Sequence, residues 1–211
     1  MSRIPLESHE SETIVQDYMN RRILVIGADG GIGKEVCNAF WDGGDSVVKY
    51  TREEMDLNIL PLPFAFIDRL LDSDVVVNCA GYFGMDYDET MNVNFRFNWE
   101  LIKLLEICTI STPLPFKAII VGSQSYINPS GFRPLYSASK AALATIVQSS
   151  ASVLFKNNVY LNLVNPPATD TPMRKKAVSG VNENWLVHPK EIADSIFRLS
   201  NSNRYGNIIN L

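Results

Sequence analysis

The sequence predicts an α/β fold with one doubly wound parallel sheet and helices on both of its faces. Short, uninterrupted apolar runs, such as residues 23–26 and 75–77, are typical of strands buried on both faces. Segments with apolar residues at helical spacing follow these runs, and the two patterns alternate along the chain, as a parallel sheet with crossover helices requires. A length of 211 residues suffices for one well-buried core and is too short for two comfortable ones.

The first half of the chain is expected to form a βαβ unit, a further helix and a third strand. A Gly-Gly pair at residues 43–44 ends the first helix, and two prolines, Pro61 and Pro63, lead into the second. The elements expected here are strands at residues 23–26, 46–50 and 74–78 and helices at residues 34–41 and 64–71.

The second half continues the alternation with two long helices, the second of them rich in Ala and Ser. The elements expected here are helices at residues 91–107, 135–155 and 189–199 and strands at residues 117–121, 159–164 and 208–211. Because neither an internal repeat nor a low-complexity linker interrupts the pattern, one domain is expected over residues 21–211. Residues 1–20 are polar and weakly periodic, so we expect an N-terminal tail or a loosely docked helix.

Composition excludes several classes of function. A net charge of −4 argues against a nucleic-acid partner, no apolar run is long enough for a bilayer, and the acidic N-terminal region does not resemble a secretory signal. Cys37, Cys79 and Cys108 form no CxxC pair and lie among apolar neighbours, as reduced thiols of a cytoplasmic protein would. His9 and His188 suit neither a Ser-His-Asp triad nor a metal site.

A glycine-rich loop at residues 27–33 lies between the first strand and the first helix. Its glycines allow a tight turn and a close approach of the backbone to a pyrophosphate, and the following helix N-terminus offers free N–H groups. This context predicts a Rossmann-type nucleotide site made by Gly27, Asp29, Gly30, Gly31, Ile32 and Gly33.

The spacing Gly-x-x-x-Gly-x-Gly, carried by Gly27, Gly31 and Gly33, resembles the fingerprint of the short-chain dehydrogenase/reductase family. The resemblance extends from about residue 21 to residue 211. The segment Asn78-Cys79-Ala80-Gly81 resembles the family's Asn-Asn-Ala-Gly turn, with Cys in the second place. The resemblance implies that Asn78, Ala80 and Gly81 steady the sheet beside the adenine ring of a nicotinamide cofactor.

Tyr136 and Lys140 are four residues apart on a predicted helix, so both side chains share one face. A lysine near a phenol favours the phenolate and brings its pKa toward the range useful for proton transfer. In isolation such a pair is more often an ordinary Tyr and Lys on an amphipathic helix. Its agreement with the glycine loop and with the family's order of motifs makes chance improbable.

The family resemblance also places two further residues in the catalytic set. Ser123 lies thirteen residues before Tyr136, where the family has the serine that binds the substrate oxygen; Ser125 fits less well and is expected to cap a turn. Residues 92–95 resemble the family's Asn-x-x-Gly segment, and alignment favours Asn94 over Asn92 as the asparagine that holds a water of the proton relay. The glycine of that segment is absent.

The loop after the strand at residues 159–164 resembles the family's Pro-Gly motif, which holds the nicotinamide carboxamide. Pro166 matches, whereas Pro167 replaces the glycine and fixes φ near −65°, which changes the expected path of the loop. Thr169 and Thr171 are expected to contact the carboxamide.

The end of the second strand favours NADP(H) over NAD(H). Thr51 stands where NAD-dependent relatives generally carry an acidic residue, and the guanidinium of Arg52 could form a charge-assisted fork with a 2′-phosphate. The alternative is an exposed Arg52 paired with Glu53 or Glu54. Farther on, Asp56-Leu57 resembles the family's Asp-hydrophobic pair beside the adenine.

Together these features imply an NAD(P)(H)-dependent oxidoreductase that moves a hydride between nicotinamide and the carbonyl or alcohol carbon of a small molecule. Ser123 and Tyr136 would bind the oxygen, and Lys140 would lower the pKa of Tyr136, bind the nicotinamide ribose and contact a water on Asn94. The alternatives are a non-catalytic NADP-binding sensor or interaction protein and a minimal sugar epimerase or reductase relative.

Three segments could form a lid over the substrate. Candidate lid segments are residues 82–89, 124–135 and 172–186. The basic run at residues 174–176 could meet an anionic substrate, but the run is expected to be a solvated surface. A homodimer or homotetramer is expected to form through the helices at residues 91–107 and 135–155, since small residues on the second allow close approach.

Overall fold

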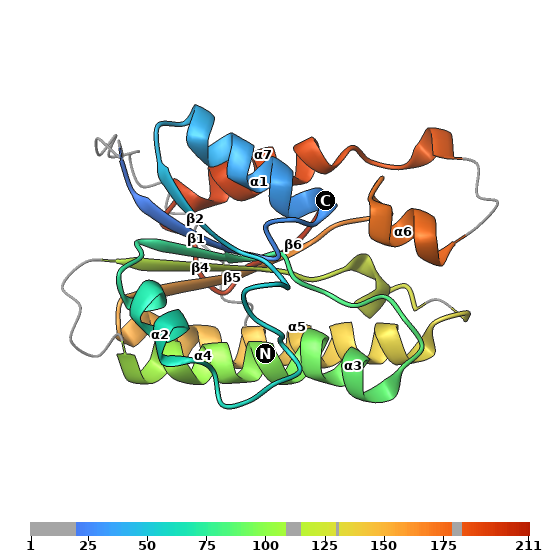
Figure 1. The fold of residues 1–211 in the computed structure, drawn as a ribbon, viewed down its shortest axis with the longest axis horizontal. Helices are drawn as coiled ribbons and strands as arrows, with labels where there is room; N and C mark the ends of the chain where they lie inside the picture. The colour runs from blue at the N-terminus through green and yellow to red at the C-terminus, as the bar shows by residue number, and fades with distance from the viewer. Residues whose placement is uncertain (1–19, 109–114, 130, 179–182) are drawn as a thin grey trace, which may run out of the picture.

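The computed structural model describes residues 20–108, 115–129, 131–178 and 183–211. The predicted N-terminal tail lies outside these residues, apart from Asn20. All strands of the described part belong to one parallel sheet in the order β2-β1-β3-β4-β5-β6 (Figure 1). The strands are β1 (Arg22–Ile26), β2 (Ser46–Tyr50), β3 (Val75–Asn78), β4 (Phe116–Val121), β5 (Val159–Asn165) and β6 (Ile208–Asn210). The predicted doubly wound parallel sheet is therefore confirmed.

Helices cover both faces of the sheet (Figure 1). On one face lie α1 (Gly31–Asp42) and α7 (Pro189–Ser200). The other face carries α2 (Phe64–Leu71), α3 (Tyr87–Met91), α4 (Phe97–Cys108) and α5 (Pro134–Lys156). Each face has its own hydrophobic core, so β3 and β4 are buried along their whole length. This double burial explains why both strands are apolar rather than alternating, apart from the buried Asn78 at the end of β3 and Lys117 near the start of β4.

The strand order places a crevice at the carboxyl ends of β1 and β3. From β1 the chain first crosses to β2 on one side and then returns to β3 on the other side of β1. Helices that leave neighbouring strands in opposite directions open a crevice at this switch point, where dinucleotides bind in such sheets. The glycine loop starts at this position.

Two local features differ from the sequence-based expectation. The helix expected at residues 91–107 begins earlier, as α3, because the side chain of Asp86 accepts a hydrogen bond from the backbone N–H of Glu89 at 2.8 Å. The π-helical segment η1 (Asn92–Arg96) then joins α3 to α4. An additional short helix, α6 (Pro172–Ala177), starts where the Thr171 side chain accepts from the N–H of Arg174. It lies beyond the carboxyl edge of the sheet (Figure 1).

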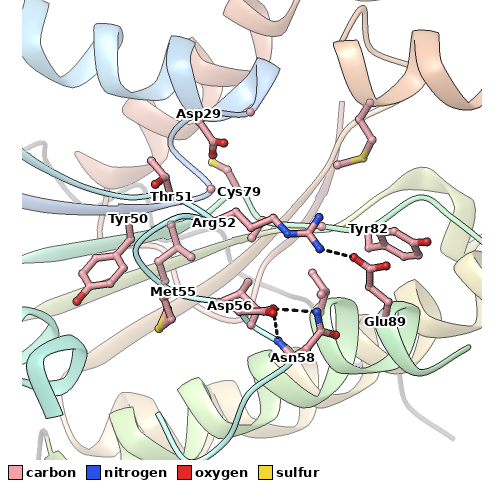
Figure 2. Close-up of a pocket in the computed structure, with 18 residues that line it drawn as sticks. Asp29, Tyr50, Thr51, Arg52, Met55, Asp56, Asn58, Cys79, Tyr82 and Glu89 are labelled. Atoms are coloured by element: carbon pink, nitrogen blue, oxygen red, sulfur yellow. Dashed lines mark hydrogen bonds and ion pairs between the residues drawn. The ribbon is translucent and has the colours of Figure 1, made fainter. Parts of the chain in front are cut away.

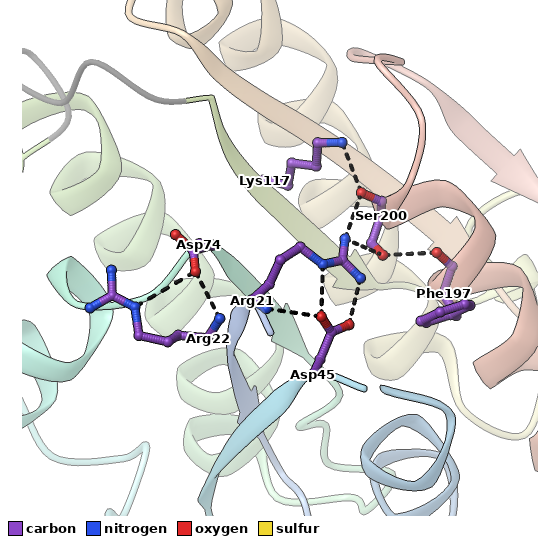
Figure 3. Close-up of polar contacts among 7 residues, drawn as sticks. All are labelled: Arg21, Arg22, Asp45, Asp74, Lys117, Phe197 and Ser200. Carbon is purple, nitrogen blue, oxygen red and sulfur yellow. Dashed lines mark hydrogen bonds and ion pairs between the residues drawn. The ribbon is translucent and has the colours of Figure 1, made fainter. Parts of the chain in front are cut away.

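A buried polar cluster joins the opposite edge of the sheet to the end of α7 (Figure 3). The Arg21 guanidinium donates to both carboxylate oxygens of Asp45, at 3.0 and 2.6 Å, and to the Ser200 carbonyl at 3.2 Å. The Nζ of Lys117 donates to the carbonyls of Ser200 and Ser202, each at 2.8 Å. Cations at a helix C-terminus satisfy its last carbonyls and favour its dipole, so this cluster fixes α7 against β1 and β4.

Within the described ranges, no helix is long and apolar enough to cross a bilayer.

Candidate active site

The glycine loop forms a tight turn that ends at the N-terminus of α1. Gly27 has a positive φ of 72°, and its N–H donates to the Tyr50 carbonyl at 2.8 Å. A Cβ added at Gly33 would lie 2.1 Å from the Gly27 carbonyl oxygen, so only glycine allows the helix to start this close to the turn. No side chain caps the N-terminus of α1. Its first N–H groups are therefore available to a phosphate.

Beside this loop, a cavity of about 210 Å³ opens at the carboxyl ends of β1, β2 and β3 (Figure 2). Nine of the residues that the sequence assigned to the cofactor line it: Gly27, Asp29, Gly30, Thr51, Arg52, Asp56, Leu57, Ala80 and Gly81. We call this cavity the adenosine pocket, because its place at the switch point and its lining match the adenosine half of a dinucleotide.

Arg52 extends across the adenosine pocket to α3 (Figure 2). Its Nη2 lies 2.9 Å from Oε1 of Glu89. Tyr82 also hydrogen-bonds Glu89, and burial together with this carboxylate raises the pKa of the Tyr82 phenol. The sequence had offered Glu53 and Glu54 as partners of Arg52; the structure instead uses Glu54 to accept the N–H of Thr51 at 2.9 Å. The partner of Arg52 is thus a residue from a distant helix.

Two side-chain amides secure the floor of this pocket. Asn78, at the end of β3, accepts the N–H of Ala80 at 3.0 Å and donates to the side-chain oxygen of Asn98 at 2.7 Å. At the rim, Asp56 accepts from the backbone and the side chain of Asn58, at 3.0 and 2.9 Å. These bonds lower the pKa of the Asp56 carboxyl and hold the segment after β2 in place.

Tyr136 lies near the start of α5, and its phenol is hydrogen-bonded to Ser123. Burial raises the pKa of Tyr136, while the Ser123 hydrogen bond and the charge of Arg174 act in the opposite direction. The ring packs edge-on against Phe83, with centroids 4.6 Å apart. The predicted pair of Ser123 and Tyr136 is therefore brought together, with the phenol protonated at neutral pH.

Lys140 is one turn farther along α5 and is 3% exposed. Its Nζ lies 5.8 Å from the centre of the Tyr136 ring and donates to the Val121 carbonyl at 3.2 Å. Burial lowers the pKa of Lys140 to about 8. The sequence led us to expect that Lys140 lowers the phenol pKa. In the structure burial raises this pKa, Ser123 and Arg174 oppose the rise only in part, and the ammonium of Lys140 bonds the end of β4 instead.

Asn94 lies in the π-helical segment η1 and is fully buried. Its Oδ1 accepts a hydrogen bond from the backbone N–H of Tyr82 at 2.8 Å, and its Nδ2 donates to the Tyr82 carbonyl at 2.9 Å. The same Nδ2 also donates to Ser139 Oγ at 3.0 Å. A Cβ added at Gly81 would lie 3.6 Å from Asn94 Oδ1 and 3.7 Å from Lys140 Nζ, so these groups converge there. Single-turn π segments of this kind are frequent at functional sites.

Asn165, at the end of β5, positions Ser123. Its Oδ1 accepts the Ser123 N–H at 2.9 Å, while its Nδ2 donates to Asn210 Oδ1 at 3.2 Å. The Ser123 hydroxyl in turn bonds Ser125 Oγ at 3.1 Å. Asn165 was not identified from the sequence as a site residue. The parallel pairing of Val121 with Val164 was the signal that could have found it, because that pairing brings both strand ends together.

A second, larger cavity of about 960 Å³ adjoins Tyr136 and Ser123. We call it the substrate cleft. Four further predicted residues line it, namely Ile32, Pro166, Thr169 and Thr171. The Thr169 hydroxyl donates to the Pro167 carbonyl at 2.9 Å, so the loop with the second proline forms its own internal contact. Met173, on α6, lines both the cleft and the adenosine pocket and thus lies between them.

The basic run at residues 174–176 is not uniformly solvated, which corrects the sequence-based interpretation. Arg174 is half-buried, lines the substrate cleft and lies with its guanidinium 5.2 Å from the centre of the Trp185 ring. Lys175 pairs with Asp170 at 2.7 Å, and Lys176 is exposed. A six-residue helix turns one side of the run toward the cleft, which the charge pattern alone does not indicate.

The structure describes the side chains of two of the three cysteines. Cys37 and Cys79 are free, and burial raises the pKa of both. The side chain of Cys108 lies outside the described part of the structure.

The residues present fit a nicotinamide dinucleotide. The uncapped helix N-terminus suits a pyrophosphate, the adenosine pocket lies on one side of it, and the cleft with Tyr136 lies on the other. Of the remaining assigned residues, Gly31, Gly33 and Asn78 shape the turn and the sheet beneath it.

A family model for short chain dehydrogenases matches residues 65–182, which is more than half of the 211 residues. The chain belongs to the short-chain dehydrogenase family. This confirms the resemblance on which the motif interpretation rested.

Individual relatives are reductases and dehydrogenases. The bifunctional ribulose 5-phosphate reductase/CDP-ribitol pyrophosphorylase of Haemophilus influenzae is 26% identical over 230 residues, covering 100% of this chain and 47% of that protein. This chain thus spans about half the length of that relative. The L-xylulose reductase of Caenorhabditis elegans is 27% identical over 200 residues, covering 80% of this chain and 77% of that protein.

Solved structures share the fold. The 3-alpha-hydroxysteroid dehydrogenase from Pseudomonas sp. B-0831, complexed with NADH, superposes with a TM-score of 0.78 at 21% identity, covering 90% of this chain and 94% of that one. ElxO with NADP bound gives a TM-score of 0.73 at 17% identity, covering 91% and 97%.

Family membership confirms the reaction class that the sequence predicted. This short-chain dehydrogenase is an oxidoreductase of the type that transfers a hydride between a nicotinamide cofactor and a carbonyl or CH–OH carbon.

Proposed function

We propose that this protein is an NADPH-dependent reductase of small polyhydroxy ketones in which Tyr136 donates the proton. The observation that carries the proposal is the convergence of Tyr136, Ser123 and Lys140 between the substrate cleft and the glycine loop. These side chains come from α5 and from the end of β4, two rigid elements on which a reacting oxygen can be held in fixed geometry.

When bound, the nicotinamide supplies the hydride that adds to the carbonyl carbon. The hydroxyls of Ser123 and Tyr136 hold the carbonyl oxygen, and Tyr136 gives that oxygen its proton. Because burial raises the pKa of Tyr136, the phenol is protonated at neutral pH, which suits reduction better than oxidation. Lys140 supplies a buried positive charge and would bind the nicotinamide ribose, and Asn94 holds the adjoining segment at Tyr82 in place.

Arg52 supports NADP(H) as the cofactor. It reaches over the adenosine pocket from the end of β2, where Thr51 brings no negative charge that would repel a 2′-phosphate. A guanidinium binds phosphate in a planar fork, so Arg52 is suited to this role. Asp56 and Leu57 line the same pocket, where they would contact the adenine. In the proposed complex, Thr169 and Thr171 contact the carboxamide.

The substrate class is supported by the relatives named above. One is named for the reduction of ribulose 5-phosphate and another for that of L-xylulose, both five-carbon ketoses. The substrate cleft has room for such a molecule, and its hydroxyl and amide lining (Ser125, Gln124, Asn128) can bond sugar hydroxyls.

We further propose a cytoplasmic homodimer or homotetramer assembled through α4 and α5. Trp99 of α4 and Val153 of α5 are 42% and 45% exposed, apolar surface that a second copy could cover. Light scattering at micromolar concentration tests this, and a monomeric mass would contradict it.

The test of function is the oxidation of NADPH and NADH, followed at 340 nm, with a panel of ketoses that includes ribulose 5-phosphate, ribulose and L-xylulose. Turnover of at least one ketose with NADPH, and its loss in Tyr136→Phe, is the expected result. Binding of NADPH without turnover of any carbonyl compound would favour the non-catalytic alternative.

A further inference from the structure

The substrate cleft carries a positive charge in a protein that is negative as a whole. The chain has a formal net charge of −4. Among the described residues that line the cleft, two are arginines, Arg133 and Arg174, and none is Asp or Glu. A cleft of one sign attracts ligands of the opposite sign and excludes others. We infer that Arg174, supported by Arg133, binds the phosphate of the substrate, so that this reductase acts on phosphorylated rather than neutral hydroxyketones. The inference rests on the proposed function.

One donor of Arg174 is unused. Its Nε is buried and has no hydrogen-bond partner within the described part of the structure. The carboxylate nearest in sequence, Asp170, forms its ion pair with Lys175 at 2.7 Å. A buried guanidinium nitrogen without an acceptor is costly, and a phosphate oxygen is the acceptor that matches a guanidinium best.

The position of Arg174 is held by packing rather than by a counter-ion. Its guanidinium lies 5.2 Å from the centre of the Trp185 ring, and Thr171 caps the helix that carries it by accepting the Arg174 N–H at 3.3 Å. Stacking on an indole orients a guanidinium without neutralising it. The charge therefore remains available to a ligand.

Arg133 has a different part in the cleft. Its Nη1 donates to the Phe83 carbonyl at 2.9 Å and its Nη2 to the Ala177 carbonyl at 2.7 Å. These bonds tie the segment after β3 to the end of α6, the helix of Arg174. Because both acceptors are neutral carbonyls, the Arg133 charge adds to the potential of the cleft, while the side chain serves to position α6.

The location suits the substrate rather than the cofactor. Arg174 lines the cleft with Tyr136 and Ser123 and is absent from the lining of the adenosine pocket. It lies close enough to Tyr136 for its charge to lower the pKa of the phenol. A small ketose can therefore place its carbonyl at Tyr136 and a terminal phosphate at Arg174.

The first test compares ribulose 5-phosphate with ribulose, two substrates that differ only in the phosphate. Wild type should prefer the phosphorylated sugar. Arg174→Gln should lower kcat/KM for ribulose 5-phosphate about 10- to 100-fold, the usual effect of losing a charge-assisted hydrogen bond. With ribulose the loss should be much smaller, because ribulose has no phosphate for Arg174 to bind, so the ratio of the two kcat/KM values is the quantity that tests the inference.

Two controls make the result specific. Lys176→Gln removes the same charge from the same helix at an exposed position and should leave both activities near wild type. Arg174→Lys keeps the charge without the fork and should retain part of the preference for the phosphorylated sugar. The Kd of NADPH, measured by nucleotide fluorescence, should be the same in all variants. If Arg174→Gln weakened NADPH binding as much as it lowered kcat/KM, Arg174 would belong to the cofactor site and the inference would be overturned.

A second measurement does not depend on the sugar. Inorganic phosphate is titrated by calorimetry into enzyme saturated with NADP⁺, which occupies the cofactor's own phosphate positions. We expect wild type and Lys176→Gln to bind phosphate and Arg174→Gln to lose this binding. The anion site would be refuted if all three proteins bound phosphate equally, or if wild type reduced ribulose as efficiently as ribulose 5-phosphate. Either result would leave the proposed reductase activity standing. Failure to bind NADPH or to reduce any ketose would instead refute the proposed function.

Discussion

The side chains of Arg52 and Glu89 form an ion pair across the adenosine pocket, with Nη2 and Oε1 2.9 Å apart (Figure 2). Arg52 is 71% exposed, whereas Glu89 is 25% exposed. The pair therefore links the end of β2 to α3 at the place where Arg52 is proposed to bind a 2′-phosphate. A 2′-phosphate and the Glu89 carboxylate would compete for one guanidinium.

This competition gives a prediction for cofactor choice. Glu89→Gln should tighten NADP(H) roughly 3- to 10-fold, because it frees Arg52 and removes a negative charge facing the 2′-phosphate. Arg52→Ala should weaken NADP(H) about 10-fold or more. Neither change should alter the Kd of NAD(H) by more than about 3-fold. The Kd values are measured by nucleotide fluorescence.

Glu53→Gln is the matched control, since Glu53 is exposed and does not line the adenosine pocket. An unchanged affinity for NADP(H) in Arg52→Ala would show that Arg52 does not read the phosphate. Tightening of NAD(H) and NADP(H) alike in Glu89→Gln would show that the glutamate restricts entry to the pocket rather than competing with the phosphate.

Tyr136→Phe isolates the proton donor. The substitution removes only the hydroxyl that bonds Ser123 and keeps the edge-on contact with Phe83, so the fold should be retained. Turnover should fall by about two to four orders of magnitude while the Kd of NADPH stays within about 3-fold of wild type. The measurement is single-turnover NADPH oxidation, with the melting temperature as the check on folding. Activity comparable to wild type would remove Tyr136 from the mechanism.

The pH dependence of reduction should report Lys140. Burial lowers the pKa of its ammonium to about 8, whereas the pKa of Tyr136 is raised, so Lys140 is the group that loses its proton first as pH rises. The kcat/KM for ketose reduction should be level below pH 7 and fall above about pH 8, up to tenfold per pH unit. In Lys140→Arg, which stays charged, the decline should move to higher pH at a lower overall rate. A level profile to pH 10 in wild type would contradict this role.

Local signals were sufficient for the parts of the site that lie within one element or one turn. The glycine loop follows directly on β1, and Tyr136 and Lys140 are one helical turn apart on α5, so strand–turn–helix context and i, i+4 spacing were enough to find them. Asp86 also provided a capping pattern with Glu89, which could have placed the start of α3 correctly.

Contacts between distant segments could not be predicted in the same way. The partner of Arg52 is 37 residues away on α3, and the bond from Ser123 to Asn165 spans 42 residues. The half-buried state of Arg174 depends on a six-residue helix that begins at a Thr-Pro step and turns one residue of a basic run inward. Periodicity and composition do not contain this information, because it arises from how separate strand ends meet at the carboxyl edge of the sheet.

The buried Lys117 should leave a signature in the pH dependence of stability. It is 4% exposed, and burial together with the charge of Arg21 lowers its pKa to about 8 from an ordinary 10.5 (Figure 3). Since the folded-state pKa lies below the unfolded value, the unfolded chain binds more protons between pH 8 and 10.5. The contribution of this lysine to the free energy of unfolding therefore rises with pH in that window, by at most about 1.4 kcal/mol per pH unit, and is constant below pH 8.

Lys117→Gln removes the titration while keeping a donor for the carbonyls at the end of α7. Urea unfolding of wild type and variant at several values between pH 7.5 and 10 tests the prediction. Other groups, such as Lys140, titrate in both proteins, so the difference between the two free energies isolates Lys117. That difference should grow in favour of wild type as pH rises through the window. If the difference between the two free energies of unfolding did not change with pH, the pKa of Lys117 would be the same in the folded and unfolded chains. Its contacts with Ser200 and Ser202 would then offset the cost of its burial.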